Sequence, residues 1–306
     1  MNDFRGGGHV ISSLERFEWG PPATFLGVPE GSTNFQSAGV VILPVPYEAT
    51  VSYMSGTRFG PRGIIDASRY IELYDHESDS EPYTQGVFTL PELILDASGP
   101  EQALAQLGQV MEELLAAGKF VIMLGGEHSL SSPPILAHVH GTVDKLSVLQ
   151  LDAHADLRVE YGGTPYSHAC VMNRVYRDVN LVPIGIRSLT SDEMALVREH
   201  DIPMVFSHEL NEPDLIDRVL GLLGDHVYLT FDIDFFDPSL MPSTGTPEPG
   251  GGTWQPTIDL LKRVFQEKHV VGCDVVELSP LAGFVAPDFL AAKLVHKLIG
   301  FHQIGK

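Results

Sequence analysis

Short apolar runs alternate with amphipathic stretches from about residue 40 onward, and this alternation limits the folds open to the chain. Most of the runs are continuously apolar, which is typical of strands covered on both faces. The predicted strands are VVILPV (40–45), KFVIML (119–124), LSVLQL (146–151), LVPIGI (181–186), PMVF (203–206), VYLTFD (227–232) and VVGCDVVEL (270–278). Alternation of this kind predicts an α/β protein with a mostly parallel sheet and helices on both faces.

The stretches between the runs predict the helices. One extends from Pro61 to Leu73, with proline at an early position, and one from Pro100 to Ala117, closed by Gly118. Others cover roughly 190–200, 212–223, 256–268 and 286–300. We find no repeat and no linker strong enough to divide the chain. We therefore expect a single domain over residues 39–306, preceded by an N-terminal arm or irregular wrap over residues 1–38, which are rich in Gly, Pro, Ser and Thr.

Composition narrows the class of protein. The net charge of −21 argues against a nucleic-acid partner, and it fits either solubility or attraction of cations, such as metal ions or a positively charged substrate. Apolar runs such as FVIML are too short to span a membrane. The N-terminal MNDFRGGGHV lacks the features of a signal peptide, and Cys170 and Cys273 are too few for a disulfide framework. We expect a cytoplasmic protein with neither a membrane nor a nucleic-acid partner.

Four predicted strands end in polar residues of the same kind. In open α/β sheets the ligand site lies outside the carboxyl ends of the strands. The segments at these ends are GGEHS with His128, DAHAD with Asp152, His154 and Asp156, DIDFFDPS with Asp232 and Asp234, and the residue Glu277 after VVGCDVV. Each segment alone has an ordinary explanation, such as a helix cap. Five carboxylates at one edge, however, repel one another and desolvate badly unless cations neutralise them.

The spacing of these residues indicates how they could act together. Residues two apart in an extended chain point to the same side, so Asp152, His154 and Asp156 can converge, as can Asp232 and Asp234. Asp and His ligands without Cys favour an oxygen-preferring divalent ion. Six of these residues are candidate ligands, namely His128, Asp152, His154, Asp156, Asp232 and Asp234. They contain four carboxylates, whose charge two divalent cations would balance. Paired metals about 3.5–4 Å apart that share a water lower the pKa of that water towards neutrality. The sequence thus predicts a two-metal hydrolytic site.

Several segments together resemble the signature segments of the ureohydrolases, the arginase and agmatinase family. These are GGEHS, DAHAD, SHAC (167–170), DIDFFDPS and GTPEPGG (245–251), and the resemblance extends from about residue 40 to the C-terminus. Three more, SYMSGTRFGPRGIIDAS (52–68), YSHACVMNRV (166–175) and GIRS (185–188), are most similar to the agmatinase branch. The resemblance implies a three-layer α/β/α domain with a central parallel sheet, two Mn²⁺ ions and a homo-oligomer, a trimer or hexamer. It also implies cleavage of agmatine, a small cationic guanidino compound, to putrescine and urea, a reaction of polyamine biosynthesis.

The resemblance also assigns roles to residues. One metal would be held by His128, Asp152, Asp156 and Asp232, and the other by Asp152, His154, Asp232 and Asp234, so that Asp152 and Asp232 bridge. His168, in SHAC, matches the catalytic histidine of the family and is expected to protonate the leaving amine. Glu277 matches the carboxylate that contacts the guanidinium, and Asp156 would orient the attacking water. The loops 159–166 and 242–252 are expected to form walls of the pocket.

Arg158 leaves the substrate open. It lies where an arginase has a side chain for the amino-acid head group, and an inward cation would repel the amine of agmatine and suit a carboxylate. Alternatively it turns outward and pairs with Glu160 or Asp178. The alternatives are therefore a hydrolase of 4-guanidinobutyrate or arginine, a metal-dependent amide deacetylase of related fold, and a binding protein that kept the fold without catalysis. All six ligand positions are intact, which argues against the last two.

Overall fold

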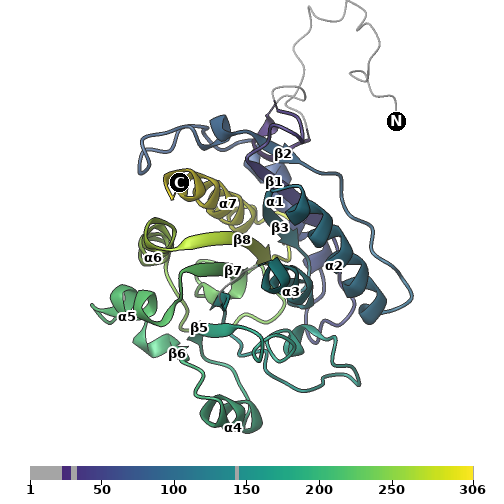
Figure 1. The fold of residues 1–306 in the computed structure, drawn as a ribbon, viewed down its shortest axis with the longest axis vertical. Coiled ribbons are helices and arrows are strands. Elements are labelled where there is room, and N and C mark those ends of the chain that lie inside the picture. The colour runs from purple at the N-terminus through teal and green to yellow at the C-terminus, as the bar shows by residue number, and fades with distance from the viewer. Residues whose placement is uncertain (1–22, 29–32, 142–144, 306) are drawn as a thin grey trace, which may run out of the picture.

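The core of the molecule is one eight-stranded sheet, shown in Figure 1. The computed structural model describes residues 23–28, 33–141 and 145–305. Within them the strand order is β2-β1-β3-β8-β7-β4-β5-β6, and every pairing is parallel. The strands are β1 (Val40–Val45), β2 (Val87–Thr89), β3 (Phe120–Gly125), β4 (Ser147–Leu151), β5 (Asn180–Ile186), β6 (Val205–Phe206), β7 (His226–Asp232) and β8 (His269–Val276).

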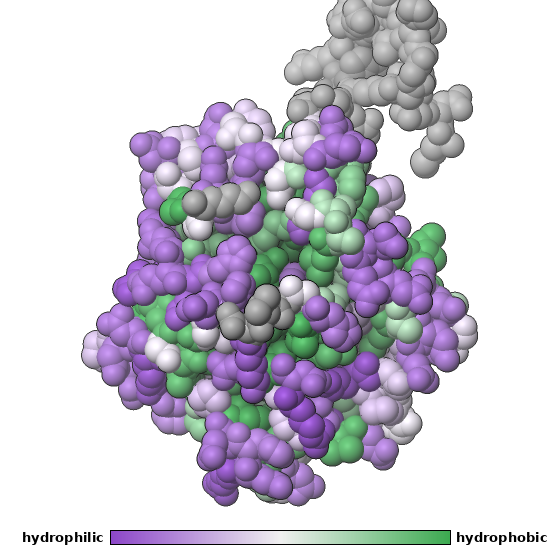
Figure 2. All heavy atoms as spheres, viewed as in Figure 1, coloured by the Kyte–Doolittle hydropathy of each residue, from purple (hydrophilic) through white to green (hydrophobic). Residues whose placement is uncertain are grey.

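Helices cover both faces of this sheet, which gives three layers (Figure 1). On one face lie α1 (Gly60–Ser68), α5 (Leu215–Leu222), α6 (Trp254–Glu267) and α7 (Ala286–Ile304). On the other lie α2 (Pro100–Ala116), α3 (Ser132–Gly141) and α4 (Ser191–Glu199). In β4, Leu149 and Leu151 pack into the α7 side, whereas Val148, just before Leu149, packs into the opposite cluster. Burial on both faces explains why the strands read as continuously apolar. Figure 2 shows that hydrophilic side chains cover most of the outside of the viewed face, with hydrophobic ones set between them.

The predicted fold class is confirmed, with three local differences. Each of the seven predicted strands overlaps an observed one, but the short β2, which pairs only with β1 at the edge of the sheet, was not predicted. Helix α3 was also missed, because its segment SPPILAHVHG lacks an amphipathic pattern, although Pro133 and Pro134 lie in its first turn, where proline is common. Helix α1 ends at Ser68, not at Leu73, since the buried Ser68 hydroxyl bonds the carbonyl of Ile65 and accepts the backbone N–H of Leu26.

The predicted N-terminal arm lies mostly outside the described residues, which omit 1–22 and 29–32. Of its described part, Phe25 and Leu26 are buried in the hydrophobic cluster that also contains Ile64 of α1. No described helix combines the length and apolar character needed to cross a membrane.

The sheet order places the predicted site. Strands β3, β8, β7 and β4 are consecutive neighbours at the centre of the sheet. Because all of them are parallel, the four segments that follow them meet at one edge. These are the segments that carry the predicted metal ligands and Glu277.

Candidate metal centre and active-site pocket

His128 is the centre of a first buried group. It begins the short helix η5 (His128–Ser131) directly after β3 and is 1% exposed. Its Nδ1 lies 3.1 Å from Asp152 Oδ2, 3.1 Å from Asp156 Oδ2 and 3.3 Å from Asp232 Oδ2. Among the described residues this nitrogen has no hydrogen-bond partner, although it is buried among three carboxylate oxygens. A buried lone pair facing three carboxylates suits a divalent cation.

A second group adjoins the first through Asp152. His154 Nδ1 lies 3.0 Å from Asp234 Oδ2 and 3.7 Å from Asp152 Oδ1. Asp152 therefore turns one oxygen to each histidine, as a bridging ligand between two ions would. Asp152 Oδ1 also accepts the backbone N–H of His154 at 2.6 Å, and the second oxygen of Asp232 accepts that of Asp234 at 2.9 Å. All six predicted ligands are brought together, in two groups that share Asp152. Their role as ligands, and bridging by Asp232, stay predictions.

The electrostatics of this cluster call for a cation. Burial, followed by the neighbouring charge of Asp234, holds the pKa of Asp232 well above its usual range, and burial and Asp152 raise the pKa of Asp156. Burial opposes protonation of His154, but Asp234 and Asp152 outweigh it and raise the pKa of His154 to about 12. In the part of the chain that the structure describes, these carboxylates form ion pairs only with the two histidines. Divalent ions would take the place of the protons on these Asp and His side chains. The residues present therefore fit a metal centre.

Unusual backbone conformations and a side-chain hydrogen bond orient three of the carboxylates. Asp156 and Glu277 adopt left-handed backbone conformations, with φ of 52° and 66°, which cost a non-glycine residue about 1 kcal/mol or more. Such strain concentrates at functional sites, where the surrounding structure imposes it. Gln150, two residues before Asp152, donates its side-chain amide to Asp152 Oδ2 at 2.9 Å and fixes the carboxylate from behind.

A further layer of side chains lies behind His128. Its Nε2 is 3.0 Å from the hydroxyl of Thr230, which donates to Asp274 Oδ1 at 2.8 Å. Asp274 also accepts the phenol of Tyr228 at 2.8 Å, and all three side chains are buried. None of these residues was identified from the sequence. The only signal available was that Thr230 and Asp274 are polar residues inside apolar strands.

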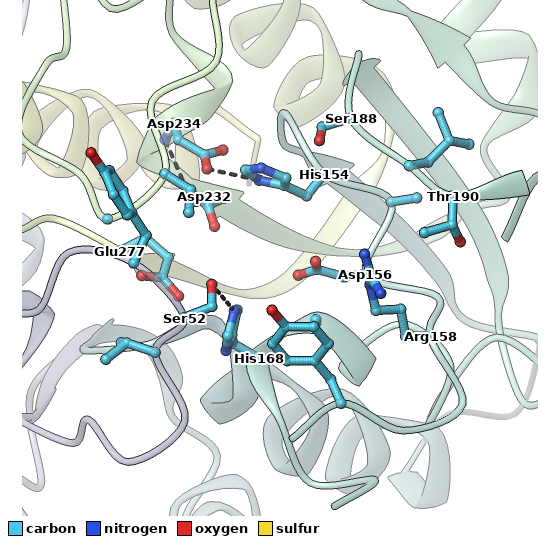
Figure 3. Close-up of a pocket in the computed structure, with 18 of the residues that line it drawn as sticks. Ser52, His154, Asp156, Arg158, His168, Ser188, Thr190, Asp232, Asp234 and Glu277 are labelled. Atoms are coloured by element: carbon cyan, nitrogen blue, oxygen red, sulfur yellow. Dashed lines mark hydrogen bonds and ion pairs between the residues drawn. The ribbon is translucent and has the colours of Figure 1, made fainter. Parts of the chain in front are cut away.

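A pocket opens above the cluster of His and Asp side chains, as Figure 3 shows. His154, Asp156, Asp232 and Asp234 line it, whereas His128 and Asp152 are not among its lining residues. The other lining residues are Val51–Met54, Ala155, Arg158, Tyr161, His168, Ala169, Ser188–Thr190, Glu193, Gly245, Thr246 and Glu277. The predicted wall segments 159–166 and 242–252 contribute Tyr161, Gly245 and Thr246.

Glu277 and His168 both face this pocket (Figure 3). Glu277 Oε1 accepts the backbone N–H of His128 at 2.6 Å, and burial, with the charge of Glu127, holds the pKa of Glu277 well above its usual range. His168 begins the short helix η6 (His168–Cys170) and is partly exposed. Its Nε2 lies 3.5 Å from the hydroxyl of Ser52, and its ring meets Tyr161 edge to face. Within the described residues, neither side chain forms an ion pair with the cluster of His and Asp side chains.

Arg158 lies along the pocket wall. Its guanidinium sits 4.9 Å from the centre of the Tyr161 ring, a cation–π contact, and it forms no ion pair with Glu160 or Asp178 among the described residues. Glu193 lines the same pocket, but its carboxylate is occupied by the backbone N–H groups of Leu157 and Thr190. The pocket wall thus contains both a cation and a buried carboxylate.

Comparison with known proteins agrees with this geometry. A parallel α/β/α fold with paired His and Asp groups at its carboxyl edge defines a metal-dependent hydrolase class, and the arginase family profile matches residues 38–300. The chain belongs to the arginase family, whose ureohydrolases act on guanidino C–N bonds and depend on a binuclear metal centre.

Particular relatives share most of the chain. The N(1)-aminopropylagmatine ureohydrolase of Synechocystis sp. is 39% identical over 89% of this chain and 92% of the relative. The agmatinase of Pyrococcus horikoshii is 33% identical over 88% and 94%. Among solved structures, agmatine ureohydrolase of Thermoplasma volcanium has a TM-score of 0.83 at 26% identity and covers 96% of this chain and 97% of its own. Proclavaminate amidino hydrolase from Streptomyces clavuligerus has a TM-score of 0.84 at 27% identity, over 92% and 97%.

Proposed function

We propose that this protein hydrolyses the guanidino group of agmatine to putrescine and urea, with two Mn²⁺ ions. The observation that carries the proposal is the shared Asp152, whose two oxygens face the two histidines beneath a pocket that also holds Glu277 and His168. The first ion would be held by His128, Asp152, Asp156 and Asp232, and the second by Asp152, His154, Asp232 and Asp234. When bound, the ions would lower the pKa of a water and supply a nucleophile at neutral pH.

Glu277 would bind and orient the guanidinium. Its buried carboxylate has one oxygen occupied by the His128 backbone, which leaves the other for the N–H groups of the substrate. Because burial raises its pKa, a cation placed against Glu277 would restore its charge and gain a charge-assisted hydrogen bond. Binding at this position therefore selects for a cationic, planar donor.

Asp156 would orient the attacking water, and His168 would protonate the leaving amine. Asp156 lines the pocket beside Arg158, where its carboxylate would accept a hydrogen bond from the attacking water. The leaving amine must be protonated before the C–N bond breaks, and His168 is the imidazole that lines the pocket outside the proposed ligands. Replacement of His168 by alanine is expected to leave the metal content normal and to lower kcat severely.

Two other kinds of substrate have specific support. Four relatives at 34–40% identity, from Synechocystis sp., two Thermus thermophilus strains and Thermococcus kodakarensis, are N(1)-aminopropylagmatine ureohydrolases, which favours the aminopropyl derivative of agmatine. The Arg158 guanidinium in the pocket wall favours a carboxylate tail, as in 4-guanidinobutyrate or arginine. We further infer a cytoplasmic homo-oligomer, a trimer or hexamer, that serves polyamine biosynthesis.

A urea assay tests the proposal. Manganese-loaded protein is given agmatine, N(1)-aminopropylagmatine, 4-guanidinobutyrate and arginine at matched concentrations, with the His168→Ala variant as control. We expect the highest kcat/KM for agmatine or its aminopropyl derivative. A preference for 4-guanidinobutyrate or arginine would assign Arg158 to carboxylate binding, and absence of urea from all four would refute the proposed activity.

A further inference from the structure

The hydroxyl of Thr50 connects two distant segments of the chain beside the pocket. It donates to Glu127 Oε1 at 2.8 Å, and it accepts the backbone N–H of His168 at 3.0 Å. It also lies 3.2 Å from Nδ1 of the His168 ring. Residue 50 follows β1, whereas residue 168 belongs to η6, so these contacts fix the loop that carries His168 to the loop after β1.

Glu127 anchors this arrangement from the interior. It is fully buried, and its Oε2 accepts the backbone N–H groups of Ala49 at 2.6 Å and Thr50 at 2.7 Å. Its Oε1 accepts the hydroxyls of Thr50 and Ser129. The loop is packed so closely that a Cβ added at Gly126 would come within 1.9 Å of the carbonyl oxygen of Tyr47. Glu127 therefore holds the Thr50 hydroxyl in one orientation.

The hydrogen bonds of the Thr50 hydroxyl determine which nitrogen of the His168 ring carries a proton. A threonine hydroxyl has one proton and two lone pairs. Since the proton is directed to the Glu127 carboxylate, both lone pairs face His168, one towards its backbone N–H and one towards Nδ1. Nδ1 must then carry a proton, which leaves Nε2 as the nitrogen that gains and loses one. Ser167, whose hydroxyl is 3.4 Å from Nδ1, is a second acceptor on the same side.

We propose that Glu127 and Thr50 are positioning residues that hold His168 in its Nδ1–H form, with Nε2 presented to the pocket. The arrangement has the logic of a catalytic triad, in which a buried carboxylate fixes the tautomer and orientation of an imidazole, here with a hydroxyl between them. Thr50 accepts from Nδ1 whether or not Nε2 is protonated, so a proton can leave Nε2 without any rearrangement behind the ring. This inference rests on the proposed role of His168 as the proton donor.

Histidine-selective ¹⁵N NMR tests the tautomer without any assay of activity. The spectrum is recorded at a pH where the ring is neutral, and the His168→Ala variant identifies the signal. We expect a protonated Nδ1 and an unprotonated Nε2 in the wild-type protein, and loss of this pattern in Thr50→Val, which replaces the hydroxyl by a methyl group. Thr50→Ser keeps the hydroxyl and should retain the pattern. A wild-type His168 with its proton on Nε2 would overturn the proposal even if Thr50→Val did not fold.

Kinetics give the second readout. Thr50→Val should lower kcat about tenfold, the effect of losing one hydrogen bond in the transition state, with KM and metal content near wild type. Thr50→Ser should restore most of this loss. A serine variant as impaired as the valine variant would mean that the methyl group of Thr50 matters and not its hydroxyl. If His168→Ala keeps normal turnover while the NMR pattern is as expected, the catalytic role of His168 fails and the tautomer assignment stands.

Discussion

The Thr230 hydroxyl offers a direct test of how this fold prepares His128 for a metal ion. It lies between His128 Nε2 at 3.0 Å and Asp274 Oδ1 at 2.8 Å, and it is fully buried. Its single proton has two acceptors, Asp274 Oδ1 at 2.8 Å and Ser131 Oγ at 3.2 Å, and whichever of them it faces, the hydroxyl can only accept from His128. His128 must therefore be protonated on Nε2, which leaves the lone pair of Nδ1 directed at Asp152, Asp156 and Asp232. Thr230→Val removes this hydroxyl and keeps the shape of the side chain.

The expected magnitude follows from the contacts that are lost. Outer partners of a metal-bound histidine fix its tautomer and orientation, and their removal typically weakens metal affinity 10- to 100-fold. This ratio corresponds to about 1.4–2.7 kcal/mol. One buried hydrogen bond whose partner is left unsatisfied costs a similar amount, about 1–3 kcal/mol. We therefore expect Thr230→Val to bind manganese 10- to 100-fold more weakly at the site that contains His128.

Competition with a chelator of known affinity measures this change, and unfolding of the metal-free variant by denaturant shows whether the fold is retained. Thr230→Ser is the matched control, because it keeps the hydroxyl and should bind within about threefold of the wild type. A folded Thr230→Val protein with wild-type affinity would refute the reasoning. So would a serine variant as weak as the valine variant, since its hydroxyl should still accept from His128.

Three further predictions concern other parts of the molecule. Asp152→Asn should lose both metals and urea release together, because Asp152 belongs to both groups, and metal analysis of the purified variant would contradict this if it found one ion fully retained. Glu277→Gln should keep its metal content but lower kcat/KM for the guanidino substrate about 10²-fold, the loss expected for a charge-assisted hydrogen bond. An unchanged kcat/KM in steady-state kinetics would exclude Glu277 from guanidinium binding. His296 is fully buried, and burial, together with Lys293, lowers its pKa from 6.5 to about 4. The unfolded chain therefore takes up a proton at this position first, so the free energy of unfolding should fall by about 3 kcal/mol as the pH falls from about 6.5 to about 4. His296→Gln should lack this part of the pH dependence in denaturant titrations, and equal losses in both proteins would contradict the assignment.

The sequence was sufficient for the main architecture because the signal was local. Continuous apolar runs marked strands buried on both faces, and polar residues at their ends marked the edge where ligands bind. Leu149 and Leu151 pack on one side and Val148 on the other, as that pattern requires. The three-residue β2 carries no periodicity of its own, and α3 lacks an amphipathic pattern.

Hydrogen bonds between distant segments could not be predicted in this way. Thr50 meets His168 118 residues later in the chain, and Thr230 meets His128 across 102 residues. The spacing of these residues in the sequence does not predict such contacts, because the residues are brought together only by the order of the strands in the sheet. The orientation of Arg158 was open for a similar reason, since its cation–π contact with Tyr161 depends on how the loop after β4 folds back.

A manganese titration of metal-free protein tests the central claim most directly. Urea release from agmatine or its aminopropyl derivative is measured alongside bound manganese, with Asp152→Asn as control. We predict that activity rises with occupancy to a maximum at two ions per chain and that it is absent from the variant. Full urea release from rigorously metal-free protein, or saturation at one ion, would contradict the two-metal hydrolase proposed for this chain.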